Sequence, residues 1–288
     1  MRILPIAASS PFKVSEYEAG KKLVESRGYE FVRDASLRTA SQSYLNGSDR
    51  ERLQELEEAL ASTKADLIWA VRGGYGITRL LPGLPAIALA KAGPVVVGIS
   101  DVTALTCHLW ARFKRKSLHA PVLARINQEP PEVLAAIDLI LKGQAHRVKY
   151  PVFTSPFEKG GLRGILIPVN LSMLTELIGT PSMPNLQDAI LLLEDANEEP
   201  YRLDRMLTHL GAAGVLKGVR AIIVGHLTAC GDNPEAVFLE RCAEFKIPCF
   251  TGFPMGHESP NWPVPVGVKA EITVNGSKAC LKILEELI

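Results

Sequence analysis

Short apolar runs alternate with amphipathic segments along the first half of the chain. The runs at 3–7, 29–32, 66–71 and 95–98 have the length of buried strands. Apolar residues recur at helical spacing in 15–27, 50–61 and 101–113. Strands that alternate with helices favour βαβ units and a parallel sheet. Ligands bind such sheets at the carboxyl ends of the strands, so the residues that follow each apolar run are the first candidates for a site.

The pattern changes after Gly143. A helix at 131–143 precedes this point, and we place a domain boundary near 143–160, between an N-terminal domain (1–145) and a C-terminal domain (160–288). In the second half we expect strands at 147–153, 162–167, 189–193, 221–224 and 249–251, and helices at 170–177, 201–213 and 234–245. Asn275-Gly276 predicts a β-hairpin between 268–274 and 279–284.

The stretch from Pro94 to Phe113 combines a strand, a sharp turn and a helix. Gly98 ends the strand, and helical spacing begins at Val102. This order places the Ser100 hydroxyl on the turn, at the positive end of the helix dipole. Such a turn is typical of a nucleophile elbow, where nearby N–H groups hold an oxyanion. Serine is also a favoured N-cap, and Val102 replaces the second glycine of the elbow pattern, so from this stretch alone capping is the commoner role.

A glycine-rich turn, Arg72-Gly73-Gly74-Tyr75-Gly76, follows the strand at 66–71. It lacks the Lys-Ser/Thr of a P-loop and the G-x-G-x-x-G spacing of a dinucleotide site. The sequence therefore favours a tight turn that brings backbone N–H groups close to a ligand over a nucleotide site.

Two further residues have positions suited to catalysis. His257 lies in a polar loop between Pro254 and Pro260, where it could act as a general base, although a surface loop histidine is the commoner case. Glu194 is the first polar residue after the buried run 189–193 and could orient an imidazole. Glu194 could also simply begin a polar loop, and the rivals for its role are Glu198, Glu199 and Asp204.

Composition narrows the function classes. The 288 residues carry 32 basic and 31 acidic side chains, a net charge of +1, which indicates neither a nucleic-acid nor a membrane partner. The five cysteines are scattered and include no C-x-x-C, so we expect a reduced, cytoplasmic protein. No histidine pair has the spacing of a helical zinc motif, and we expect neither a metal nor a cofactor. No apolar run reaches the ~20 residues of a membrane span.

Five segments together resemble the LD-carboxypeptidase family, serine peptidases that include the microcin C self-immunity proteins. They are AVRGGYGITRLLP (70–82), VVGISDVTAL (96–105), NLSMLTELIGTP (170–181), ILLLEDANEEPYRLDRML (190–207) and GFPMGHESPNWPVPVG (252–267). The resemblance covers nearly the whole chain. It implies an α/β protein with an N-terminal Rossmann- or flavodoxin-like parallel-sheet domain, a C-terminal mixed α/β domain, and an active site at their interface. It also implies a homodimer.

The resemblance assigns roles to the candidates. The nucleophile falls on Ser100 in GISD, the acid on Glu194 in LEDANE, and the base on His257 in GH. All three residues singled out by their positions are thus the family's catalytic positions. We expect the backbone N–H groups of Asp101 and of Gly73 or Gly74 to form the oxyanion hole. For substrate contacts we expect Arg72, Tyr75 and Asn170.

The implied substrate is a murein tetrapeptide. Cleavage would fall between meso-diaminopimelate and the terminal D-alanine, in cell-wall recycling. A second hypothesis keeps the triad but takes a peptidyl nucleotide of the microcin C type, with Trp262 as a stacking wall; Trp262 could equally be a packing residue. A third is a non-catalytic small-molecule binding protein, in which Ser100 is a cap and the glycine-rich turn is a ligand loop.

The chain departs from the family pattern at two segments. It has His119-Ala120-Pro121-Val122 where the family often has H-G-P-M, and Pro168-Val169-Asn170-Leu171 where the family often has G-G-N-L. Both segments are expected to line the substrate cleft. The triad positions match the family, so we expect any difference from it to lie in the shape of the substrate pocket and in its substrate preference.

Overall fold

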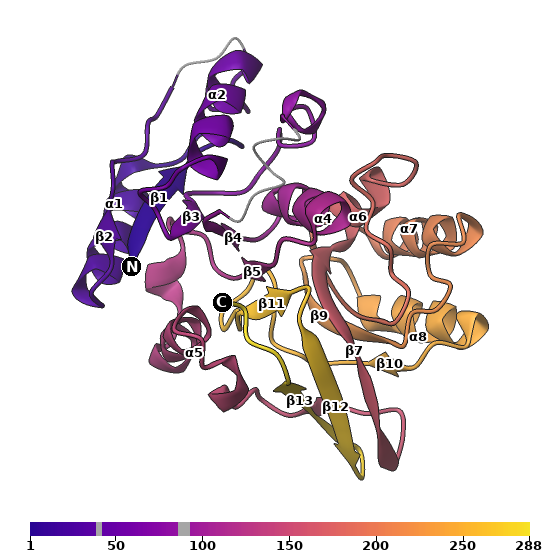
Figure 1. The fold of residues 1–288 in the computed structure, drawn as a ribbon. Helices are drawn as coiled ribbons and strands as arrows, with labels where there is room; N and C mark the ends of the chain where they lie inside the picture. The colour runs from indigo at the N-terminus through magenta and orange to yellow at the C-terminus, as the bar shows by residue number, and fades with distance from the viewer. Residues whose placement is uncertain (39–41, 86–92) are drawn as a thin grey trace.

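The computed structural model describes residues 1–38, 42–85 and 93–288, which form an α/β structure with two sheets (Figure 1). The first sheet has the strand order β11-β5-β4-β3-β1-β2. Its parallel strands are β1 (Arg2–Ile6), β2 (Glu30–Phe31), β3 (Leu67–Ala70), β4 (Val95–Gly98) and β5 (Ser117–His119). The expected parallel sheet is confirmed.

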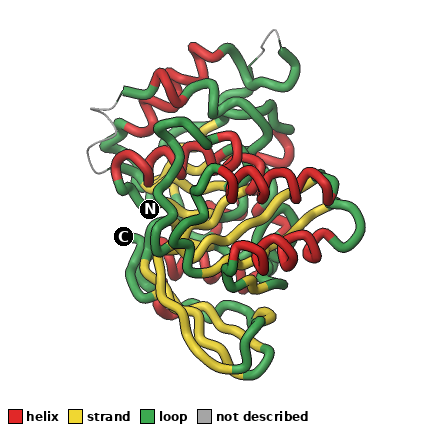
Figure 2. The backbone as a smooth tube through the Cα atoms, turned by 90° about the vertical axis from the view of Figure 1, so that its right-hand side faces the viewer, coloured by secondary structure: helices red, strands yellow, loops and turns green. Residues whose placement is uncertain are grey.

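The second sheet is mixed, with the order β10-β9-β8-β7-β12-β13-β6. Its parallel part contains β7 (Lys159–Asn170), β8 (Ala189–Ala196), β9 (Ala221–Thr228) and β10 (Cys249–Phe250). The antiparallel strands are β12 (Lys269–Asn275), β13 (Lys278–Ile283) and β6 (Phe153–Thr154). The β12–β13 hairpin turns at Asn275-Gly276 as expected and extends away from the body of the molecule (Figures 1 and 2).

Helices pack around both sheets (Figure 2). They are α1 (Val14–Ser26), α2 (Asp49–Leu60), α4 (Val102–Phe113), α5 (Pro131–Leu141), α6 (Leu171–Glu176), α7 (Pro200–Ala212) and α8 (Pro234–Phe245). A capping box starts α2: Ser48 accepts from the N–H of Glu51, whose side chain accepts from the Ser48 N–H. Across the described residues, every helix is too short or too polar to span a lipid bilayer.

One strand connects the two halves of the molecule. β11 (Val264–Val266) belongs to the C-terminal half but pairs antiparallel with β5 of the first sheet, Val264 opposite His119. The two sheets also share a core, in which Trp69 and Val97 belong to the same apolar cluster as Ile190 and Ile223. The loop that precedes β11 carries His257, so this pairing brings that loop to the first sheet.

The structure differs from the sequence predictions in two respects. The strand expected at 147–153 is absent; the chain there has a 3-10 turn (Ala145–Arg147) and an extended segment, and only Phe153–Thr154 pairs as β6. The strands β5 and β11 were not predicted, because three residues each are too few to show a period.

Candidate active site

Ser100 occupies the turn between β4 and α4 in a left-handed conformation. Its φ is 64°, which is uncommon for a residue with a side chain and is often found in the strained turns of functional sites. The N-cap of α4 is Asp101, and it makes no side-chain capping bond. The capping role considered for Ser100 is therefore wrong, and the hydroxyl lies at the tip of a sharp strand-to-helix turn.

His257 and Glu194 are hydrogen-bonded to each other. His257 Nδ1 lies 2.6 Å from Glu194 Oε2, and Glu194 is fully buried. Burial lowers the pKa of His257, but the charge of Glu194 and this hydrogen bond raise it, and the net pKa lies above its usual value. The arrangement can hold an imidazole in one orientation and stabilise its protonated form.

Backbone features bring these two side chains together. The register of β8 against β9 shifts between Leu193 and Asp195, so Glu194 sits at a bulge, a feature that redirects side chains. Gly256 packs against it: a Cβ added there would lie 3.0 Å from Glu194 Oε2. The positive φ of Gly256, 136°, also favours glycine. The loop of His257 can therefore approach the buried carboxylate closely.

Ser100 and His257 line the same cavity, which we call the Ser100 cavity. Its volume is about 640 Å³, and its walls come from both halves of the chain. Among the residues expected at the site, those that line it are Arg72, Gly73, Gly74, Ser100, Asp101, Asn170 and His257. Glu194 lies behind His257 without lining the cavity. Tyr75 is not brought to the cavity; its ring packs against Tyr44, with the centroids 5.9 Å apart.

The glycine-rich turn lies directly against the Ser100 elbow. A Cβ added to Gly73 would lie 2.7 Å from the Cβ of Ser100, whereas one added to Gly74 would collide with Ser10. The N–H groups of Gly73, Gly74 and Asp101 donate no hydrogen bond to the described part of the chain. These contacts favour Gly73 over Gly74 as the glycine nearest to the nucleophile.

Two further histidines lie near His257. Burial, together with repulsion by His257, lowers the pKa of His119 to about 3. Burial also lowers the pKa of His226, although the charges of Glu258 and Glu194 oppose the shift. Both imidazoles are therefore neutral near pH 7, and His257 is the one hydrogen-bonded to a buried carboxylate.

Asp195 and Arg125 are among the residues of the cavity wall that sequence reasoning did not identify. Asp195 is buried and accepts hydrogen bonds from the Ser172 N–H (2.8 Å) and from Asn170 Nδ2 (3.1 Å), which fixes the start of α6 to the end of β8. Arg125 Nη1 lies 3.4 Å from the His257 carbonyl oxygen. Asp195 directly follows Glu194 in LEDANE, and this neighbouring acidic residue was a signal that could have identified it. Nothing in the local sequence indicates Arg125.

Trp262 does not line the Ser100 cavity. Its side chain is 8% exposed and belongs to the apolar core, with its ring centroid 5.9 Å from that of Tyr150. It is a packing residue, and the stacking wall considered for a nucleotide substrate is not present at this position.

Comparisons with known proteins identify the family of this chain. The family model for the LD-carboxypeptidase N-terminal domain matches residues 3–120, and that for the C-terminal domain matches residues 163–272. The murein tetrapeptide carboxypeptidase of Pseudomonas aeruginosa is 30% identical over 291 residues, covering 95% of this chain and 94% of that protein. A Synechocystis sp. protein described as a carboxypeptidase is 34% identical over 90% of this chain and 87% of its own length.

Solved structures of the same family also match this chain. The crystal structure of muramoyltetrapeptide carboxypeptidase from Oxalobacter formigenes has a TM-score of 0.87 and 28% identity, covering 98% of both chains. The microcin C7 self-immunity protein of Escherichia coli is a more distant relative, 25% identical over 92% of this chain and 88% of its own length. With both family models matched in order and relatives aligned over nearly their whole length, this chain belongs to the LD-carboxypeptidase family.

Proposed function

We propose that this protein is a serine LD-carboxypeptidase that releases the terminal D-alanine from murein tetrapeptides in the cytoplasm, during cell-wall recycling. The observation that carries the proposal is that His257, hydrogen-bonded to the buried Glu194, lines the same cavity as the strained Ser100 elbow. Relatives named for murein peptides support the substrate class. The family resemblance supports a homodimer as the assembly.

In the proposed reaction, His257 removes the proton of the Ser100 hydroxyl, and Ser100 attacks the carbonyl carbon of the L-centre. Glu194 stabilises the imidazolium through the 2.6 Å hydrogen bond. The tetrahedral oxyanion is held by the N–H groups of Asp101 and Gly73, donors that are typically worth ~10²–10³ in rate each. His257 then protonates the leaving nitrogen of D-alanine, and water hydrolyses the acyl-enzyme with His257 again as base.

The test is D-alanine release from a murein tetrapeptide by the wild type and by Ser100→Ala. We expect the variant to keep the wild-type unfolding transition and to lose roughly 10⁴-fold or more in kcat. Full turnover by Ser100→Ala would overturn the mechanism.

A peptidyl nucleotide is the alternative substrate, because the microcin C7 self-immunity protein is also a relative. Parallel incubation with a peptidyl nucleotide and mass spectrometry of the products separates the two substrate classes. A fluorophosphonate distinguishes either enzyme from a non-catalytic binding protein. It labels Ser100 in an enzyme and leaves a folded binding protein unlabelled.

A further inference from the structure

The position of the glycine-rich turn is set by contacts on several sides. Gly73 packs against Ser100, Gly74 against Ser10, and Gly76 against Arg52, each so closely that an added Cβ would meet its neighbour. The Tyr75 N–H donates to Ser10 Oγ at 3.2 Å. A turn rich in glycine has many conformations available when unrestrained, so these contacts select one of them.

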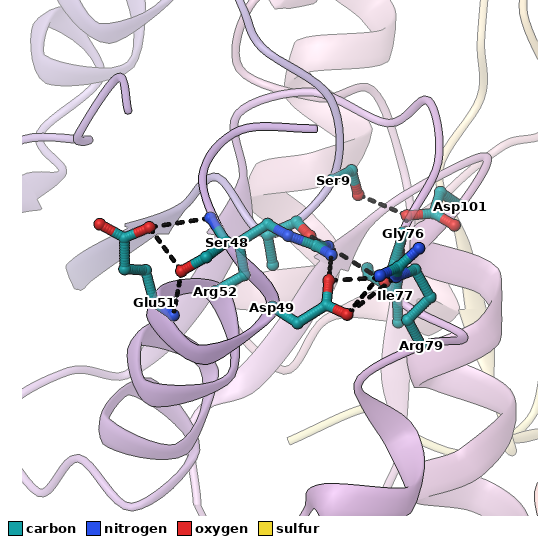
Figure 3. A network of polar contacts seen from close by, with 10 residues as sticks. Ser9, Ser48, Asp49, Glu51, Arg52, Gly76, Ile77, Arg79 and Asp101 are labelled. Carbon is teal, nitrogen blue, oxygen red and sulfur yellow. Dashed lines mark hydrogen bonds and ion pairs between the residues drawn. The ribbon is translucent and has the colours of Figure 1, made fainter. Parts of the chain in front are cut away.

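The side chain of Asp101 holds this turn from the nucleophile's side. Its Oδ2 accepts from Ser9 Oγ at 2.6 Å and from the Ile77 N–H at 3.0 Å (Figure 3). Ser9 belongs to the loop after β1, and Ile77 directly follows the glycine-rich turn. Asp101 is 1% exposed, so both hydrogen bonds are shielded from water. The residue that follows the nucleophile therefore ties two loops to the start of α4.

Arg52 holds the turn from the opposite side. This fully buried guanidinium donates from Nη1 to the carbonyls of Ala8 (2.6 Å) and Gly76 (3.0 Å). Its Nη2 bonds to Asp49, which is also paired with Arg79 at the surface (Figure 3). A buried cation is unfavourable unless it is paired and hydrogen-bonded, and here its partners include the same two loops that Asp101 connects.

We propose that the Asp101 side chain and Arg52 are positioning residues that fix the glycine-rich turn so that the N–H groups of Gly73 and Asp101 converge on the oxyanion. The inference rests on the proposed serine mechanism. Donors stabilise a transition state most when they are already oriented before the charge develops. Loosening the turn therefore weakens oxyanion binding while leaving ground-state substrate contacts largely in place.

The test compares Asp101→Ala with Asp101→Asn, whose amide oxygen can still accept both hydrogen bonds. We expect Asp101→Ala to lose roughly 10²-fold in kcat with KM changed less than about threefold, and Asp101→Asn to recover most of that loss. The affinity for a tetrahedral phosphonate analogue of the tetrapeptide should fall in parallel with kcat/KM, while the affinity for the tripeptide product stays near the wild-type value.

Ser9→Ala and Arg52→Lys provide milder variants, in case Asp101→Ala does not fold. Each removes or weakens only part of the network, and each should lower kcat and phosphonate affinity together. Variants that lose stability but keep the kcat and the phosphonate affinity of the wild type would overturn the inference and leave the network a purely structural role.

The inference can fail separately from the proposed function. If the wild type releases no D-alanine, the substrate proposal fails, and the rate of fluorophosphonate labelling at Ser100 still tests the turn, because the phosphoryl oxygen occupies the same hole. Equal labelling rates in wild type and folded Asp101→Ala would then reject the positioning role.

Discussion

Glu194 is hydrogen-bonded to His257 and raises its pKa, and this makes a pH profile informative. Burial lowers the pKa of His257, the adjacent carboxylate raises it, and the net pKa is raised. A general base must be neutral, so kcat/KM should rise with pH through this raised pKa. In Glu194→Gln the charge is lost and the pKa of His257 falls. We expect the acidic limb of kcat/KM to move to lower pH, and kcat to fall roughly 10²- to 10⁴-fold.

The matched control is Asp204→Asn, which changes an exposed carboxylate of α7 that the sequence left as a rival for the acid. Asp204→Asn should keep the acidic limb of the kcat/KM profile at the wild-type pH. An unchanged acidic limb in folded Glu194→Gln would show that Glu194 does not set the pKa of the base.

A carboxypeptidase also needs a cation for the terminal carboxylate of its substrate. Arg72 and Arg125 both line the Ser100 cavity, and neither forms an ion pair with a carboxylate of the described residues. In the proposed mechanism His257 protonates the leaving nitrogen, and in D-alanine the carboxylate is only one carbon away from that nitrogen. Arg125, beside the His257 carbonyl, is therefore the better placed of the two.

We expect Arg125→Ala to raise KM for a tetrapeptide roughly 10- to 100-fold and to remove its preference over the tetrapeptide C-terminal amide, since a hydrogen bond to a charged group is worth about 1.5–3 kcal/mol. Arg72→Ala should keep that preference. Steady-state kinetics with the tetrapeptide and its amide shows which arginine binds the terminal carboxylate. If Arg72→Ala loses the preference and Arg125→Ala keeps it, the carboxylate is bound by Arg72, the residue that the sequence suggested.

At the scale of elements, the sequence predicts what local periodicity encodes. The long helices and the buried strands β4 and β8 are found close to their expected bounds, because their apolar residues repeat several times. β5 and β11 have three residues each, and β11 contains Pro265, which argues against a strand except at an edge. Their pairing depends on contacts between residues 145 to 149 positions apart, which no local pattern records.

The residues of the site divide in the same way, into those that a local sequence pattern indicates and those that depend on long-range contacts. Ser100, Glu194 and the glycine-rich turn could be named in advance because each follows an apolar run, and parallel strands end at one edge of their sheet. Arg125 and the Asp101–Ser9 bond could not, because they depend on how loops pack against each other. The ring of Tyr75 packs against Tyr44 rather than lining the cavity, because membership of a turn does not fix which way a side chain points.

At the scale of the whole molecule, the site requires the two halves to stay in contact. Ser100 belongs to the first sheet, and Glu194 belongs to the second. The His257 loop reaches both because β11 pairs with β5 a few residues later. The apolar cluster that runs through both sheets supports this arrangement.

Val264 tests this dependence, since its side chain is fully buried in β11 opposite His119. Truncation to Ala removes two methyl groups from the shared core and should lower the free energy of unfolding by about 2 kcal/mol. Because β11 anchors the His257 loop, we also expect kcat to fall at temperatures where the variant is folded. Urea unfolding and D-alanine release measure the two effects, with the half-exposed Val14→Ala as control. A destabilised but fully active Val264→Ala would mean that the loop is held in place by its bond to Glu194 and its neighbours alone, without help from the strand that joins the halves.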